Sequence, residues 1–116
     1  MDLENVAYLE DGDITSDGKL KIPSNKPVVV MISGSFCGYC TRFSPEFQKA
    51  ANKVGGKVIM ANITIDKEKK LGKELTSYIP AFKGVPMVVV FKNGKYVKTF
   101  DGPRTSAALI EFVNGL

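Results

Sequence analysis

The feature that most constrains the fold is a short apolar run followed closely by two cysteines. Residues 28–32 are all apolar, a pattern typical of a strand buried on both faces. Beyond them, apolar side chains recur at helical spacing from Phe43 to Val54, which predicts a helix with one buried stripe. Cys37 and Cys40, the only cysteines of the chain, therefore lie where a central strand passes into the N-terminus of a helix.

That position favours thiol chemistry. The N–H groups of a first helical turn have no partner within the helix, and the macrodipole favours negative charge, so a thiolate at Cys37 is stabilised. Cys40 lies one turn further on the same face, within disulfide reach. The alternative is a structural disulfide or a pair of inert thiols, but a bridge over two residues constrains little chain. Two thiolates in a chain without histidine cannot complete a zinc site within one subunit. We expect no metal, although a cluster shared between two chains stays open.

Composition restricts the other classes of function. A chain of 116 residues predicts a single domain. The net charge of +4 comes mostly from lysine, and the densest cluster, residues 67–73, mixes lysine with acid and lacks arginine. This indicates a solvated helix face and no nucleic-acid partner. No apolar stretch approaches the roughly 20 residues of a membrane helix, and the acidic N-terminus shows no secretory pattern. We therefore expect a cytoplasmic monomer with no membrane partner.

The remaining pattern predicts an α/β chain. A mixed central sheet with helices on both faces follows from the element order, the first two central strands being parallel. A small extension, residues 1–26, packs on a domain of residues 27–116 and contains a hairpin. Residues 6–9 form a short element whose type the sequence leaves undecided, the hairpin lies at 14–22, and strands are predicted at 28–32, 58–63, 87–91 and 96–100 with a turn at Asn93-Gly94. The first helix runs from the cysteines to Lys53 with a bend at Pro45. A second helix at 66–78 buries Leu71, Leu75 and Tyr78, and a last helix from Thr105 buries Leu109, Phe112 and Val113.

Several separated motifs then coincide with one known pattern. The two cysteines follow a strand and open a helix, Pro45 lies five residues past Cys40, and Pro86 precedes a strand and the Asn-Gly turn. In these features residues 27–116 resemble the thioredoxin superfamily, and residues 100–105 look like the catalytic domains of protein disulfide isomerases. Gly38 is shared by thioredoxins and those domains. The resemblance implies a thioredoxin fold and a thiol–disulfide oxidoreductase that acts on proteins.

The resemblance also implies roles for individual residues. Cys37 would attack a substrate disulfide and Cys40 would resolve the mixed disulfide, with no cofactor beyond this redox-active pair. The partners would be proteins carrying disulfides or thiols, together with a recycling reductase or oxidant. The residues implied in substrate contact are Phe36, Gly38, Tyr39, Val85 and Pro86. The bond before Pro86 would be cis, the alternative being an ordinary edge-strand proline. For the apolar residues of this group the alternative is ordinary packing.

The chain departs from the family pattern in three places. Phe36 replaces a tryptophan, while Met31 and Asn62 replace a buried acid and its lysine partner. Without that acid nothing evident takes the proton of Cys40, so we expect resolution to be slow at neutral pH and faster as pH rises. Two alternative functions remain. A glutaredoxin-like activity is disfavoured because no glycine pair follows Gly102, and a non-catalytic binding module would keep its partner without the thiols.

Overall fold

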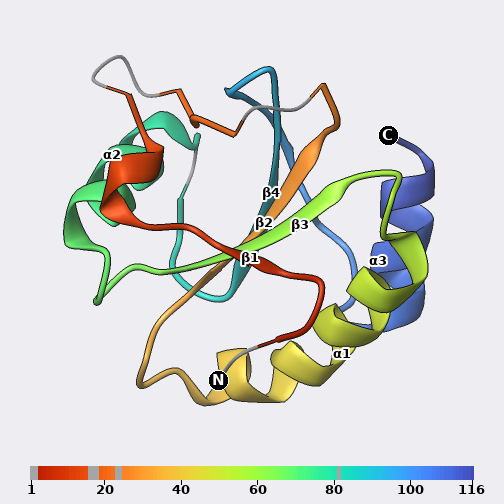
Figure 1. Cartoon of the computed structure of the whole chain (residues 1–116). Coiled ribbons are helices and arrows are strands. Elements are labelled where there is room, and N and C mark those ends of the chain that lie inside the picture. Colours follow the sequence, from red (N-terminus) through yellow and green to blue (C-terminus); the bar gives the residue numbers. More distant parts are fainter. Residues whose placement is uncertain (1–2, 16–18, 23–24, 81) are drawn as a thin grey trace.

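The centre of the fold is a mixed sheet. A computed structural model describes residues 3–15, 19–22, 25–80 and 82–116. Within them, five strands form one sheet in the order β1-β3-β2-β4-β5 (Figure 1). They are β1 (Ala7–Tyr8), β2 (Val28–Ser33), β3 (Ile59–Thr64), β4 (Met87–Lys92) and β5 (Lys95–Thr99). β3 runs parallel to β1 and β2, whereas β4 is antiparallel to β2 and β5. The predicted mixed sheet is confirmed.

Helices cover both faces of this sheet. They are α1 (Gly38–Val54), α2 (Lys69–Tyr78), α3 (Ser106–Asn114) and the short 3₁₀ helix η1 (Asp11–Asp13). α1 and α3 lie on one face and α2 on the other (Figure 1). Alternate residues of β2 serve the two cores: Val29 and Met31 pack with α1 and α3, while Val30 and Ile32 pack with α2. Burial on both sides explains why β2 is apolar throughout. No helix in the described ranges combines the length and apolar character needed to cross a bilayer.

The N-terminal segment takes part in the sheet. The element of open type predicted at residues 6–9 contains β1, whose Ala7 pairs with Ala61 and Tyr8 with Asn62. β1 thus forms one edge of the sheet, beside β3 (Figure 1). A two-residue strand is too short to show the alternation on which sequence analysis relies.

The same segment caps α2. The Asp11 carboxylate accepts a hydrogen bond of 2.8 Å from the backbone N–H of Leu71, in the first turn of that helix. In return, the backbone N–H of Asp11 donates to the Glu68 carboxylate at 3.1 Å. Glu68, the N-cap residue, makes no capping bond with its own side chain. An acid from 60 residues away therefore satisfies an N–H that α2 cannot satisfy locally. The helix begins at Lys69, three residues later than predicted.

Two predicted details are wrong. Leu71 and Leu75 are fully buried, as expected, but Tyr78 is 46% exposed. It is the last residue of α2, and the extended Ile79 that follows is the one buried in the core. Phe112 is only partly buried, and its ring packs edge-on against Phe100 with centroids 5.1 Å apart.

The predicted hairpin is reduced to a single bridge. Ile14 and Leu20 pair antiparallel as an isolated bridge, and the turn at residues 16–18 lies outside the described residues. The backbone N–H of Leu20 also donates to the Gly94 carbonyl, in the turn between β4 and β5, at 3.1 Å. That turn is the Asn-Gly hairpin expected from the sequence, and both Asn93 and Gly94 have positive φ.

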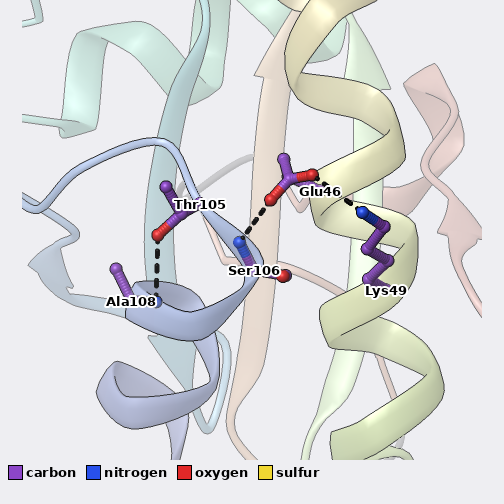
Figure 2. Close-up of polar contacts among 5 residues, drawn as sticks. All are labelled: Glu46, Lys49, Thr105, Ser106 and Ala108. Carbon is purple, nitrogen blue, oxygen red and sulfur yellow. Dashed lines mark hydrogen bonds and ion pairs between the residues drawn. The ribbon is translucent and has the colours of Figure 1, made fainter.

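A carboxylate joins α1 to α3. Figure 2 shows Glu46 of α1 accepting the backbone N–H of Ser106, at the start of α3, at 2.9 Å. Thr105 caps the same helix by accepting from Ala108 N at 3.2 Å. The hydrogen bond from Ser106, aided by Lys49, lowers the pKa of Glu46. The start of α3, and with it the loop that carries Arg104, is held against the helix of the cysteines.

Candidate active site

Cys37 is the N-cap of α1. Its Sγ accepts a hydrogen bond of 3.0 Å from the backbone N–H of Cys40, and its carbonyl accepts from Thr41 N at 3.1 Å. The sulfur thus lies where the free N–H groups of the first turn converge. This is the geometry that stabilises a thiolate at a helix N-terminus, and it agrees with the junction predicted from the sequence.

The two cysteines form a disulfide, with Cα atoms 5.1 Å apart. Their surroundings differ, because Cys37 is half-buried whereas Cys40 is only 4% exposed. A substrate sulfur can therefore approach Cys37 more readily than Cys40. The difference follows from helix geometry, since Cys37 lies at the solvent end of the first turn and Cys40 faces the sheet.

The loop between β2 and the cysteines is held in place by Asp66. Asp66, which follows β3, accepts the backbone N–H of Ser35 at 2.9 Å. Hydrogen bonds from the Ser35 backbone and side chain lower the pKa of Asp66. Gly34 lies between two site residues: a Cβ built there would be 3.6 Å from Val85 Cγ2 and 3.9 Å from Cys37 Cβ. Val85 is thereby placed beside the reactive cysteine.

The Val85–Pro86 peptide bond is cis, as the resemblance implied. It directly precedes β4, whose Met87 pairs with Ile32 of β2. A cleft of about 590 Å³ opens here between the segment around Pro86 and the loop that leads to α3. The cysteines do not line this cleft, but two of their neighbours, Val85 and Arg104, do. The cleft is therefore bounded by residues near the site and not by the disulfide itself.

The residues flanking the cysteines are exposed. Phe36 is fully exposed and Tyr39 is 63% exposed. The guanidinium groups of Arg42 and Arg104 lie 4.7 and 5.6 Å from the centroid of the Tyr39 ring, within cation–π distance. Gly38, the first residue of α1, is also exposed, and a side chain there would meet no atom within 4 Å. Two cations therefore lie against the ring of Tyr39, which is two residues after Cys37.

Two of the three departures from the family pattern lie side by side in the sheet. Met31 and Asn62 are register partners on β2 and β3, and both are buried. The Ser33 hydroxyl donates to Asn62 Oδ1 at 3.0 Å. In the described residues, no group of three or more histidine, cysteine, aspartate or glutamate side chains is arranged to hold a metal.

All the predicted site residues lie around the disulfide or along the adjoining cleft. Sequence analysis missed Arg42, Asp66 and Arg104. Arg42 follows Tyr39 at the i,i+3 spacing of helical neighbours, which is a usable signal. Asp66 and Arg104 reach the site only through the tertiary fold.

A disulfide at the start of a helix, beside a cis-proline and on this sheet, defines a thiol–disulfide oxidoreductase. The thioredoxin family model matches residues 15–115, and the chain belongs to that family.

Individual relatives agree. The chain is 34% identical to a putative thioredoxin-like protein, 453L, of Invertebrate iridescent virus 6, covering 95% of this chain and 93% of that protein. It is 33% identical to the probable protein disulfide-isomerase A4 of Caenorhabditis elegans, over 95% of this chain but 16% of that protein. A human ERp44 structure has the same fold, with a TM-score of 0.79 at 17% identity, covering 99% of this chain and 30% of that one. The chain thus spans most of the viral relative and a small part of the other two.

Proposed function

We propose that the chain exchanges disulfides with the thiols of other proteins. The Cys37 thiolate attacks a substrate disulfide, forms a mixed disulfide and releases one substrate thiol. The Cys40 thiolate then attacks Cys37 Sγ, which releases the second thiol and forms the Cys37–Cys40 disulfide. Two electrons and two protons pass to the substrate, and an external dithiol restores the reduced site. The reverse sequence donates a disulfide.

The observation that supports a protein substrate is the surface around Cys37. Phe36 is fully exposed, and the cleft beside Pro86 is lined by Val85, which lies beside Gly34 in the loop before Cys37. An extended polypeptide can lie in such a groove and offer backbone hydrogen bonds at Val85. A small disulfide has no use for so large a contact area.

The test compares two substrates. The reduced chain, recycled by dithiothreitol, is expected to reduce the interchain disulfides of insulin, with activity lost in Cys37→Ser. Glutathione mixed disulfides on a small peptide serve as the second substrate. Rapid turnover of these with no insulin reduction would contradict the proposal and support the glutaredoxin-like alternative. A partner bound equally well after both cysteines are replaced would support a binding module.

The direction of electron flow follows from the reduction potential of the cysteine pair. Reference values are about −270 mV for thioredoxin and about −180 mV for protein disulfide isomerase. We propose a reductase working as a monomer in the cytoplasm, and therefore expect a value near the lower figure after equilibration in graded thiol buffers. A value near the upper figure would contradict this setting and indicate a disulfide donor or isomerase. Sedimentation analysis tests the monomeric state.

A further inference from the structure

A second, smaller cavity lies behind the disulfide. It has a volume of about 180 Å³ and Cys40 is part of its wall. In the described residues the buried polar side chains are Ser33, Ser44 and Asn62. All three line this cavity, although they come from three different elements. Buried polar groups cost free energy unless they are hydrogen-bonded. Their position around one cavity beside Cys40 therefore suggests a shared role.

The hydrogen bonds of these side chains leave oxygen atoms available to water. The one proton of the Ser33 hydroxyl is shared between two acceptors, Asn62 Oδ1 at 3.0 Å and Ile63 O at 3.2 Å from Ser33 Oγ. The Ser44 hydroxyl donates to the Cys40 carbonyl at 2.9 Å. A hydroxyl that donates its proton keeps two lone pairs as acceptors. Both serines can therefore accept hydrogen bonds from a molecule in the cavity.

The cavity is large enough for several water molecules and reaches solvent. One water occupies about 30 Å³ in the liquid, a fraction of the volume present. Its wall runs from buried Cys40 to the exposed residues Thr41 and Lys67. Among the described residues, the titratable side chains in the wall are Tyr8 and Lys67, besides Cys40, and none of these lining residues is a carboxylate. The cavity thus connects buried Cys40 to bulk water along neutral polar side chains, with the ammonium group of Lys67 at its exposed end.

We propose that water in this cavity takes the proton of Cys40 during resolution, with Ser33 and Asn62 as positioning residues for that water. The proposal rests on the two-step exchange described above. Starting from the Cys37 mixed disulfide, the Cys40 S–H bond breaks and its proton passes to cavity water and on to the buffer. The Cys40 thiolate attacks Cys37 Sγ, the bond to the substrate sulfur breaks, and the leaving thiolate is protonated by solvent. Cavity water thus takes the place of the buried acid, whose absence led us to expect no acceptor for this proton.

The experiment follows both steps in one trace. The reduced chain is mixed with Ellman's reagent in a stopped-flow instrument, where attack by Cys37 releases one thionitrobenzoate and attack by Cys40 releases a second. Asn62→Leu keeps the volume of the side chain but removes its polar atoms. Met31→Leu is the matched control, because Met31 lines the same cavity and the exchange leaves it apolar.

For Asn62→Leu we expect the second phase to slow by about tenfold at pH 7, a modest share of what acid–base groups contribute. The pH at half-maximal rate should rise, while the first phase stays within about twofold. Met31→Leu should match the unaltered chain in both phases. A second phase unchanged in Asn62→Leu at every pH, or slowed equally by Met31→Leu, would overturn the proposal. Absence of any second phase in the unaltered chain would instead contradict the two-step function.

Ser33→Ala keeps the test valid if Asn62→Leu does not fold. It deletes one hydroxyl and leaves Asn62 in place, so we expect roughly threefold slowing of the second phase with the same direction of pH shift. An unchanged second phase in this variant would also contradict the proposal. Circular dichroism before mixing shows that each variant is folded.

Discussion

The two cysteines occupy the same turn of α1, yet their surroundings have little in common. Cys37 is half-buried at the helix N-cap and follows fully exposed Phe36. Two residues further on, the ring of Tyr39 lies against the guanidinium groups of Arg42 and Arg104. Cys40 is 4% exposed and borders a small cavity lined mostly by neutral polar residues, with Lys67 at its exposed end. One cysteine thus adjoins an exposed surface, whereas the other adjoins a partly enclosed polar cavity.

The difference shows how one helical turn separates two tasks. At the N-cap, a sulfur receives the free N–H groups of the helix and is stabilised as a thiolate. Three residues later, a side chain faces the sheet, where a charge would be expensive. The second sulfur must therefore lose its proton at the moment of reaction, and the polar cavity provides for that without a buried ion.

The largest effects are expected when each cysteine in turn is replaced by serine. Cys37→Ser should lose insulin reduction by on the order of 10³-fold or more, as expected when a nucleophile is removed. Cys40→Ser should retain the first step and accumulate a mixed disulfide with the substrate, visible as a covalent adduct by mass spectrometry. A stable adduct in Cys37→Ser and none in Cys40→Ser would reverse the assignment.

A carboxylate placed in the cavity should reduce the difference between the two cysteines, because Cys40 would then have a proton acceptor beside it. Met31→Asp introduces an acid beside Cys40, and we expect the second Ellman phase at pH 7 to become about tenfold faster. Stability should fall by roughly 3 kcal/mol at pH 7, because no cation is buried with the new charge. Burial raises the pKa of such a carboxyl, so this loss should grow as pH rises above about 4. Urea denaturation at pH 4 and pH 7 measures it. An unchanged second phase would contradict the account of resolution.

A smaller effect is expected on the substrate side. Phe36→Ala should raise KM for a protein disulfide about fivefold, equivalent to roughly 1 kcal/mol of lost contact. Reaction with Ellman's reagent should not change, because that substrate is too small to use the contact. Val97→Ala, an exposed residue of β5 that lines neither cavity, serves as the control. Equal changes with both substrates would show that Phe36 acts on Cys37 and not on the substrate.

The smallest effect concerns Glu46, which holds the start of α3, and the loop that carries Arg104, against α1. A lowered pKa means that the charged Glu46 stabilises the fold above its ordinary value of 4.5, and that this contribution is lost as pH falls through the lowered value. Glu46→Gln should therefore reduce the urea midpoint slightly at pH 7 and have no effect near pH 2. Glu111→Gln, an exposed acid on α3, is the control. A loss that persists at pH 2 would mean that Glu46 acts through packing.

Much of the fold could be predicted because local pattern and tertiary structure agree there. The apolar run of β2 is buried on both faces, and the parallel pairing of β2 with β3 follows from the helix between them. The turn at Asn93 and Gly94 is where its residue types require. These elements are specified within a few residues of chain, so spacing and propensity suffice.

The rest depends on contacts between distant segments. Asp11 caps α2 from 60 residues away, and no pattern in α2 itself shows this. Tyr78 fits the apolar stripe of α2, but the helix ends at this residue and the extended Ile79 after it is buried in its place. The cavity at Cys40 was missed because Ser33, Ser44 and Asn62 are unremarkable singly. Only the pairing of β2 with β3 and the packing of α1 bring them together.

Timed alkylation of the reduced chain tests the asymmetry of the two cysteines most directly. Iodoacetamide is added at pH 7, samples are quenched with acid, and peptide mass spectrometry reports the modified fraction of each cysteine. The account predicts that Cys37 is modified first and that Cys40 stays protected until much later, because only Cys37 combines access with a helix N-cap. Equal rates, or faster modification of Cys40, would contradict the account.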